Sequence, residues 1–259
     1  MPATSRPTAL ITGASSGIGL ELARQLASRN HDLVLTARSA GKLHELAAEL
    51  TQRHGIQAHV LAEDLLDPAA PARIRDHLAH AGIAIDILVN NAGFGLAGPF
   101  ASLPIERQMG ILQVNVMALT NLTGLLLPGL LARPAARILN VASTAGFLPL
   151  PNLAIYAAGK AYVVSFSEAL SAELAGTSVT VTCLCPGATD TNFATAAGMN
   201  KKRLFRFAAS AESVAREGLE AMFAGRRRVV TGLGNRLATA AVGFAPRGLV
   251  LRLAKKALR

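Results

Sequence analysis

The chain has 259 residues, of which 51% are hydrophobic and 16% charged, with a formal net charge of +10. This length and composition suit one α/β domain whose sheet is covered on both faces. Nucleic-acid binding is disfavoured, because only 4% of the residues are aromatic and no recognition motif accompanies the positive charge.

Short apolar runs alternate with stretches of helical periodicity along the whole chain. Strands are expected near 8–12, 32–37, 56–61, 86–90, 137–142, 178–184 and 228–231, and helices near 17–29, 40–54, 69–81, 104–132, 156–175 and 211–223. Such alternation predicts a parallel sheet of about seven strands with right-handed crossovers and helices on both faces. A single domain spanning residues 1–259 is expected.

A glycine-rich turn joins the first strand to the first helix, where Gly13-Ala14-Ser15-Ser16-Gly17-Ile18-Gly19 follows Thr12. Gly13 permits a tight turn, Gly17 lets the backbone approach a pyrophosphate, and Gly19 allows close packing of the helix on the strand. The helix N-terminus then faces the phosphates. The segment predicts a dinucleotide site in a Rossmann-type doubly wound sheet, with an ordinary strand-to-helix turn as the alternative.

The end of the second strand indicates which dinucleotide is preferred. NAD sites place an acidic residue here, about 20 residues beyond the glycines, to bind the ribose 2′-hydroxyl. The sequence instead ends in Arg38, and Asp32 lies at the start of the strand. A guanidinium can bind a 2′-phosphate, and Ser15 or Ser16 could add a hydroxyl contact. We therefore expect NADP(H) rather than NAD(H), with a solvated arginine as the alternative.

Tyr156 and Lys160 are four residues apart in a helical stretch and so face the same side. A lysine ammonium there stabilises phenolate and lowers the tyrosine pKa from about 10. Such a tyrosine suits proton transfer in carbonyl reduction or alcohol oxidation. Ser143 directly follows an apolar strand, which places its hydroxyl at the carboxyl end of the sheet, where ligands bind.

From about Thr8 to Thr191, these segments resemble the short-chain dehydrogenase/reductase family, and in particular its shorter dehydrogenase branch. The similar motifs are the TGxxxGIG loop at 12–19, NNAG at 90–93, YxxxK at 156–160 and PGxxxT at 186–191. Gly159 is a small departure, because many members of the family carry serine there.

The resemblance implies a catalytic tetrad. Ser143 would hold the carbonyl oxygen, Tyr156 would transfer the proton, Lys160 would bind the ribose and lower the tyrosine pKa, and Asn115 would position a water. It also implies the cofactor-binding residues, which are Gly13, Ser15, Ser16, Gly17, Ile18, Gly19, Arg38, Asp64, Leu65, Asn91, Ala92, Gly93, Tyr156, Lys160, Pro186, Gly187, Thr189 and Thr191. For Asp64, a surface aspartate without a ligand is the alternative.

The apolar stretch from Val116 to Leu131 raises the question of a membrane span. Polar residues and Pro128 interrupt it, and it is shorter than the usual ~20 residues. A core or subunit-interface helix is therefore the expectation. The resemblance implies that this helix and the helix of Tyr156 form a dimer interface, giving a homodimer or homotetramer.

Cysteine and histidine usage indicates the compartment and the absence of a metal site. Cys183 and Cys185 are too close on one strand for a sound disulfide, so free buried thiols in a reducing cytoplasm are expected. The first strand begins within ten residues, which leaves no room for a secretory signal. The six histidines form no metal-binding spacing, so no metal is expected.

A substrate flap is expected at about 190–210, after the segment beside the nicotinamide. It contains Phe193, Met199, Leu204, Phe205 and Phe207. These apolar side chains favour a lipophilic carbonyl substrate, although they could equally be closing contacts over the fold.

Positive charge is concentrated near the C-terminus. Residues 1–199 carry 12 basic and 13 acidic residues, whereas residues 200–259 carry 14 and 3. In the tail at about 246–259, Arg252, Lys255, Lys256 and Arg259 share one helical face, and Leu249, Val250, Leu253 and Ala257 share another. A basic amphipathic helix of this kind predicts contact with the inner face of an anionic membrane. The alternatives are a tail that packs on the domain, or attraction of an acidic carrier-linked substrate.

We expect an NADP(H)-dependent oxidoreductase acting on a small-molecule ketone, aldehyde or secondary alcohol. The alternative is a catalytically silent nucleotide-binding regulator or membrane scaffold, against which the complete tetrad argues. A dehydratase or epimerase of the extended family fits the chain length and the form of the glycine loop less well.

Overall fold

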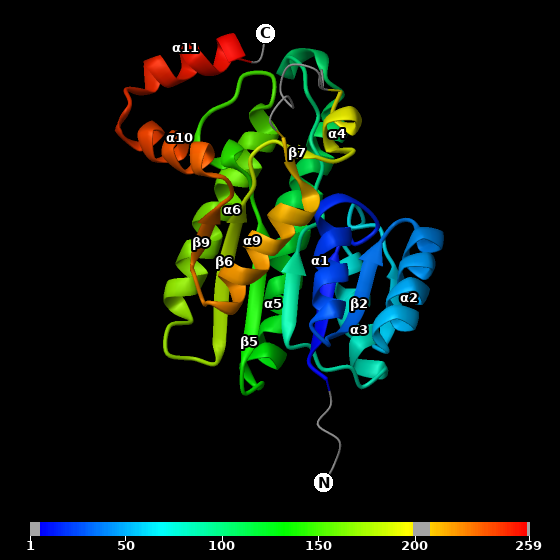
Figure 1. Ribbon diagram of the computed structural model, residues 1–259. Helices are drawn as coiled ribbons and strands as arrows, with labels where there is room; N and C mark the ends of the chain where they lie inside the picture. The colour runs from blue at the N-terminus through cyan, green and yellow to red at the C-terminus, as the bar shows by residue number, and fades with distance from the viewer. Residues whose placement is uncertain (1–5, 199–207, 258–259) are drawn as a thin grey trace.

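The computed structural model describes residues 6–198 and 208–257, and these residues form a parallel seven-stranded sheet covered by helices (Figure 1). The strand order is β3-β2-β1-β4-β5-β6-β9. The strands are β1 (Thr8–Thr12), β2 (Asp32–Ala37), β3 (Ala58–Ala62), β4 (Ile87–Asn90), β5 (Ala136–Val141), β6 (Val179–Cys185) and β9 (Arg228–Val230). The predicted α/β fold class with a doubly wound parallel sheet is confirmed.

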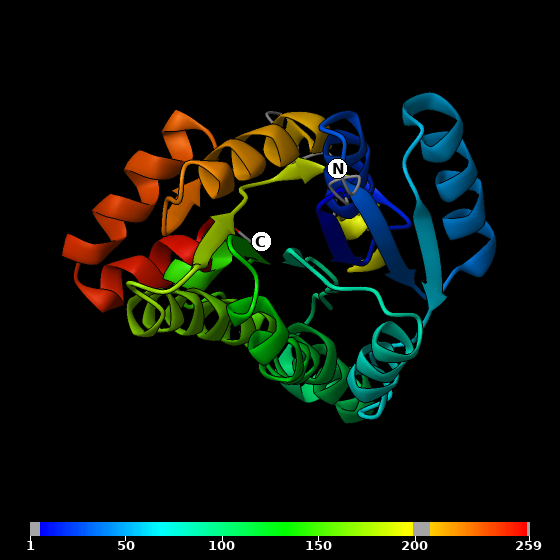
Figure 2. The same cartoon turned by 90° about the horizontal axis from the view of Figure 1, so that it is seen from below.

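Helices cover both faces of the sheet, as Figure 2 shows along the strands. On one face lie α1 (Gly17–Ser28), α2 (Ala40–His54) and α9 (Ala211–Phe223). On the other lie α3 (Ala70–His80), α5 (Leu119–Leu131) and α6 (Ala154–Glu173). The strand order reverses at β1, because β2 lies on one side of it and β4 on the other. In open α/β sheets, the crevice at such a reversal is where ligands bind.

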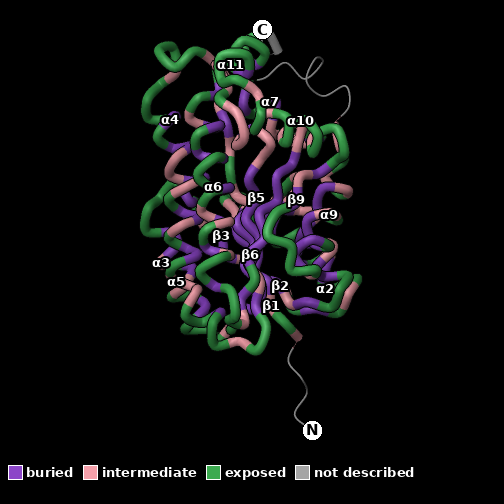
Figure 3. Tube along the Cα trace, turned by 90° about the vertical axis from the view of Figure 1, so that its left-hand side faces the viewer, coloured by how far each residue is buried: buried purple, intermediate pink, exposed green. Residues whose placement is uncertain are grey.

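The central strands are apolar because both of their faces are buried (Figure 3). Leu10 of β1 pairs with Val34 of β2 and Leu88 of β4, and all three are fully buried. The core therefore lies in two layers, one on each side of the sheet. This rigid frame fixes the carboxyl ends of the strands, from which the site residues project.

The long apolar helix predicted at 104–132 is interrupted. It consists of α4 (Ile105–Leu112), a π-helical turn (Gln113–Ala118) and α5. Within residues 6–198 and 208–257, this Ile105–Leu131 segment is the one helix long and apolar enough to cross a membrane. It packs on the sheet through Leu119, Leu122 and Leu130, which is the position of a core helix.

The other predicted ranges agree with the structure to within two residues, but some elements were not predicted. Two short strands, β7 (Thr189–Asp190) and β8 (Ala209–Ser210), form a small second sheet beyond the main one. Helix α7 (Phe193–Ala196) follows β7 within the expected flap. Of that flap, residues 199–207 with Met199, Leu204, Phe205 and Phe207 lie outside the described residues.

Two further helices, α10 (Leu233–Phe244) and α11 (Arg247–Ala257), follow β9 and project beyond the carboxyl ends of the strands (Figure 1). The tail at 246–259 was expected to be helical, whereas α10 was not predicted.

Cys183 and Cys185 on β6 are buried free thiols, with their sulfur atoms 3.6 Å apart.

Candidate active site

A cavity of about 1070 Å³ opens at the carboxyl ends of the strands, beside the reversal at β1. The structure brings nearly all the predicted site residues to its wall. These are Gly13, Ser15, Ser16, Gly17, Ile18, Arg38, Asp64, Leu65, Asn91, Ala92, Gly93, Ser143, Tyr156, Lys160, Pro186, Gly187, Thr189 and Thr191. Among the described residues, Gly19 and Asn115 are the two predicted members that do not line it.

The glycine loop leaves a space that side chains would fill. A Cβ on Gly13, whose φ is +68°, would lie 2.9 Å from the Ala92 Cα. A Cβ on Gly17, whose φ is +57°, would lie 3.1 Å from the Thr191 Cγ2 across the cavity. Gly19 is needed for packing instead, because a Cβ there would collide with the Gly13 carbonyl. Both positive φ angles and the close approaches favour glycine.

The loop is held in place by Thr12 and Asn91. The Thr12 hydroxyl accepts hydrogen bonds from the backbone amides of Asn91 and Ala92, at 2.9 and 3.0 Å. The Asn91 side chain donates to the Thr12 carbonyl at 2.9 Å. The NNAG segment therefore braces the loop between β1 and β4, and its side-chain amide is used for this contact.

The start of α1 fits a phosphate group. In this fully described segment, Ser16 at the N-cap makes no side-chain capping bond, and the first turn of α1 contains no acidic residue. The first backbone amides of a helix lack intrahelical partners and carry partial positive charge. Together with the space over Gly13 and Gly17, this arrangement fits the pyrophosphate of a dinucleotide.

The far end of the cavity carries two cations. Arg38 follows β2, and Lys42 lies in the first turn of α2. Ser39 between them is the N-cap of α2 and, in this described stretch, makes no side-chain capping bond. Asp32 lies at the opposite end of β2, where it accepts a hydrogen bond from the Gln57 amide at 2.8 Å. A phosphate at this end would meet two cations and a helix N-terminus.

Asp64 and Leu65 line the cavity beyond β3. The Asp64 carboxylate also accepts a hydrogen bond from the Leu66 amide at 3.0 Å, which stabilises the local turn.

Lys42 was missed by the sequence reasoning. A basic residue four positions after Arg38, on the first turn of a predicted helix, is the signal that could have identified it.

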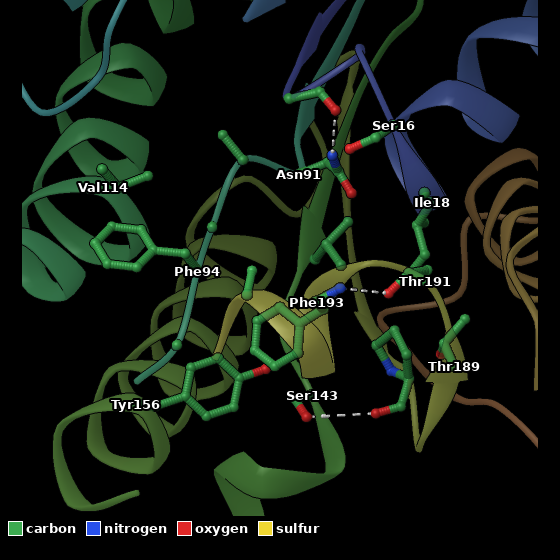
Figure 4. A pocket seen from close by; sticks show the side chains of 18 of the residues that line it. Ser16, Ile18, Asn91, Phe94, Val114, Ser143, Tyr156, Thr189, Thr191 and Phe193 are labelled. Atoms are coloured by element: carbon green, nitrogen blue, oxygen red, sulfur yellow. Dashed lines mark hydrogen bonds between the residues drawn. The ribbon is translucent and has the colours of Figure 1, made fainter. Parts of the chain in front are cut away.

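Tyr156, Lys160 and Ser143 converge at the opposite end of the cavity. Tyr156 and Lys160 lie on α6 and are 8% and 5% exposed. The Lys160 Nζ donates to the Val141 carbonyl at 2.7 Å and lies 5.9 Å from the centre of the Tyr156 ring. The Ser143 hydroxyl accepts from the Ala145 amide at 3.1 Å and donates to the Pro186 carbonyl at 3.4 Å. Figure 4 shows Ser143 beside Tyr156 and Phe193.

Burial shifts the pKa values of the two α6 side chains in opposite directions. Desolvation raises the pKa of Tyr156 to about 12, and the neighbouring Ser143 hydroxyl acts in the opposite direction. Desolvation lowers the pKa of Lys160 to about 8. In the chain without a cofactor, burial thus acts against the lowering of the Tyr156 pKa that the family resemblance implies. The Lys160 ammonium donates its hydrogen bond to the Val141 carbonyl.

Asn115 lies behind the residues that line the cavity. It lies in the π-helical turn and is 1% exposed. Its side chain donates to the Phe94 carbonyl and accepts from the Phe94 amide, both at 3.0 Å. With both ends of its amide bound, the Asn115 side chain holds the loop at Gly93–Gly95 next to Lys160.

The substrate end is mostly apolar. Tyr156 and Phe193 of α7 are in contact, with ring centres 5.2 Å apart (Figure 4). The other apolar side chains that line this end, which sequence reasoning missed, are Phe94, Leu148, Leu150, Leu153, Ala196 and Ala254. They lie in loops, in α7 and in α11, and no local motif marks them.

The Pro186–Thr191 segment closes the cavity on the side of β6. Thr189 donates to the Gly187 carbonyl at 3.1 Å, and Thr191 accepts from the Phe193 amide at 3.2 Å. Thr191 thereby connects the glycine loop to the start of α7. The cavity thus has a polar, cationic end suited to a dinucleotide and an apolar end with a buried phenol suited to a carbonyl or alcohol.

Comparison with known proteins identifies the same family throughout. The family model described as short chain dehydrogenase matches residues 7–202. The very-long-chain 3-oxoacyl-CoA reductase of Phaeosphaeria nodorum is 38% identical over 180 residues, which are 68% of this chain and 53% of the relative. The chain thus spans about half the length of that relative.

Two solved structures show a similar fold over nearly the whole chain. A short-chain dehydrogenase from Sphingobium yanoikuyae in complex with NADPH is 33% identical, with a TM-score of 0.85 and 94% of each chain covered. A short-chain dehydrogenase/reductase from Burkholderia phymatum in complex with NAD is 29% identical, with a TM-score of 0.80 and 93% and 94% covered. Similar chains were thus solved with either dinucleotide.

Proposed function

The chain belongs to the short-chain dehydrogenase/reductase family, and on that premise we propose that it transfers hydride between NADP(H) and a carbonyl or secondary alcohol. The observation that carries this proposal is the cavity itself. It joins a glycine loop with a free helix N-terminus at one end to Tyr156, Lys160 and Ser143 at the other.

The preference for NADP(H) is supported by the charges at the end of β2. Arg38 and Lys42 both line the cavity there, and Asp32 is held at the other end of the strand. A 2′-phosphate would form charge-assisted hydrogen bonds with both cations, whereas a 2′-hydroxyl would leave them without an anionic partner.

The bound dinucleotide supplies or accepts the hydride. In the direction of reduction, Tyr156 donates its phenolic proton to the carbonyl oxygen, and Ser143 donates a hydrogen bond to the same oxygen. A pKa of about 12 keeps Tyr156 protonated, as an acid must be. Lys160 offsets the charge of the resulting phenolate, and its pKa of about 8 lets it exchange protons near neutral pH. Asn115 acts indirectly by holding the backbone at Phe94.

The substrate is proposed to be a lipophilic ketone or an acyl-type carbonyl compound. The walls around Tyr156 are formed by apolar side chains such as Phe94, Leu153 and Phe193. Lys160 is the charged residue at this end among the described residues, and its ammonium is already bonded to Val141.

Three properties of the whole protein are proposed alongside this activity. A homodimer or homotetramer is supported by exposed apolar residues on α5 and α6, and a cytoplasmic location by the two buried thiols. Contact of the tail with the inner face of a membrane is supported by exposed Arg247, Arg252 and Lys255 in α11.

The Tyr156→Phe variant tests the catalytic proposal. We expect its turnover of any active carbonyl to fall by roughly 10²–10⁴-fold, because the proton donor is removed, while NADPH binding stays unchanged. Turnover is measured by NADPH absorbance over aliphatic, aromatic, steroid and 3-oxoacyl carbonyls, and binding by calorimetry.

Tyr162→Phe is the matched control, because Tyr162 is the only other tyrosine and its ring lies outside the cavity lining described above. Near-wild-type turnover in Tyr156→Phe would remove the proposed acid. NADPH binding by the wild type without turnover of any carbonyl would instead favour a catalytically silent nucleotide-binding protein.

A further inference from the structure

Helices α10 and α11 form a helical hairpin beyond the carboxyl ends of the strands (Figure 1), where α11 contributes Ala254 to the cavity wall. Ala254 of α11 lines the cavity and is 5% exposed, and Val250 one turn earlier is 8% exposed. At the start of α10, Asn235 packs directly against Gly187 and donates to the Thr231 carbonyl at 2.8 Å. The hairpin is therefore anchored on the Pro186–Thr191 segment and forms a roof over the site.

The outer surface of the hairpin is apolar. None of the residues of α10, all of which the structure describes, is buried. Leu233, Leu237 and Phe244 follow helical spacing along one stripe and are 71%, 65% and 93% exposed. Leu249 and Leu253 of α11 are also exposed, at 49% and 59%. Large apolar side chains gathered on a projecting element mark an interaction surface rather than ordinary scatter.

The C-terminal region that contains the hairpin carries only positive charges on its side chains. Residues 221–259 contain nine lysines and arginines and no aspartate or glutamate. On α11, Arg252 and Lys255 lie on the side opposite the buried Val250 and Ala254, given 100° per residue in an α-helix. The exposed surface of the hairpin therefore combines apolar side chains with basic ones.

We propose that the α10–α11 hairpin docks on an anionic lipid bilayer and that the cavity beneath it takes its carbonyl substrate from that bilayer. This inference rests on the proposed function and extends it by naming the source of the substrate. A basic and apolar helical surface has favourable interactions with anionic headgroups and with acyl chains. A second copy of the hairpin is a poorer partner, because a symmetric contact would bring its cations together.

Tryptophan fluorescence tests docking without any need for catalysis. The chain contains no tryptophan, so Phe244→Trp introduces a single reporter at the most exposed apolar position of the hairpin. With NADPH present, we expect vesicles of phosphatidylcholine and phosphatidylglycerol containing brominated lipids to quench this reporter. Leu131→Trp at the end of α5 is the matched control and should not be quenched.

The charge requirement is tested in the same assay. The triple variant Arg247→Gln, Arg252→Gln and Lys255→Gln in the Phe244→Trp background should bind the vesicles on the order of a hundredfold more weakly, given roughly fivefold per basic residue. Arg75→Gln on α3 is the control and should bind as before. Binding that depends on protein concentration but not on lipid would indicate a second copy as the partner and overturn the proposal.

Substrate delivery is tested with a long-chain and a short-chain 2-alkanone. Anionic vesicles should raise kcat/KM for the long ketone in the wild type but not in the double variant Leu237→Ser and Phe244→Ser, whereas the short ketone should be reduced equally in all samples. Turnover without quenching of the reporter would overturn docking and delivery from the bilayer, and would leave the proposed oxidoreductase function in place. Turnover of neither ketone would overturn the proposed function and the route of entry, and quenching in that case would leave docking in place.

Discussion

At the scale of single residues, burial has opposite effects on the pKa values of Tyr156 and Lys160. Both lie on α6 inside the same cavity wall, and desolvation disfavours the charged form of each. The phenol therefore stays protonated across the physiological range, while the ammonium titrates at about pH 8. The chain without a cofactor thus holds a neutral acid next to a lysine that is ready to exchange its proton.

These pKa values predict the pH dependence of carbonyl reduction. Because the lowered pKa of Lys160 is about 8, its charge is present below that pH and lost above it, so kcat/KM should fall as pH rises through about 8. Lys160→Arg should have lower activity but no such fall up to pH 10, since a guanidinium stays protonated. The profiles are measured with saturating NADPH.

An unchanged alkaline limb in Lys160→Arg would assign the inflection to another group. Tyr156 is not that group according to its raised pKa, because its own deprotonation would fall near pH 12.

At the scale of elements, the junction of β2 and α2 sets the expected cofactor preference. Arg38 follows the strand and Lys42 lies in the first helical turn, so two elements bring two cations to one end of the cavity. Their contribution depends on a phosphate being present, because each then gains a charge-assisted hydrogen bond.

The double variant Arg38→Ala and Lys42→Ala should lower kcat/KM for NADPH relative to NADH by roughly a hundredfold or more, at about 1.5–3 kcal/mol per lost charged bond. Arg75→Ala, an exposed arginine on α3, should leave the ratio unchanged. The ratio is obtained from initial rates with each cofactor. The assignment of the NADPH preference to Arg38 and Lys42 would be contradicted by a wild type that does not prefer NADPH. It would also be contradicted by a double variant that keeps the wild-type preference.

The strands and most helices could be predicted because their patterns are local. Each strand of the sheet is a short apolar run, and each amphipathic helix buries one stripe, so periodicity identifies both. The π-helical turn within 104–132 was missed because hydropathy does not distinguish it from α-helix. Helix α10 was missed although Leu233, Leu237 and Phe244 recur at helical spacing, because Gly234 and Gly243 lower the helix propensity of the segment.

The sequence predicted those site residues that belong to local motifs. The glycine loop, Ser143, Tyr156 and Lys160 are brought together because they follow strands or share a helix face. Phe94, Leu153 and Ala254 reach the cavity only through the tertiary fold, so no spacing in the sequence identifies them. The tail illustrates the same limit, since the sequence grouped Val250 with exposed Leu249 and Leu253, whereas the fold buries it.

At the scale of the whole molecule, two exposed apolar surfaces lie on different sides. One is the hairpin, and the other is on the long helix and α6, where Met117 and Tyr162 are 59% and 40% exposed. The two helices touch at this surface, because the Thr120 hydroxyl and the Tyr162 hydroxyl are 3.0 Å apart. Contiguous helices with exposed apolar side chains suit a symmetric contact with a second copy.

The double variant Met117→Asp and Tyr162→Asp should convert the proposed dimer or tetramer to a smaller species, because four carboxylates would face one another across a two-fold axis. Sedimentation velocity measures the change. Leu237→Asp on the hairpin is the matched control and should leave the mass unchanged. A monomeric wild type, or dissociation by the control variant alone, would place the contact elsewhere.

The π-helical turn at Gln113–Ala118 contains one residue more than a regular α-helix would, and this extra residue sets the position of Asn115 at the site. Removing one residue there would restore a regular α-helix, which is the more favourable local geometry. It would also rotate α4 relative to α5 by about 100° and withdraw Asn115 from Phe94. Insertions and deletions that surface loops tolerate are therefore excluded from this helix, even when they would improve its hydrogen bonding.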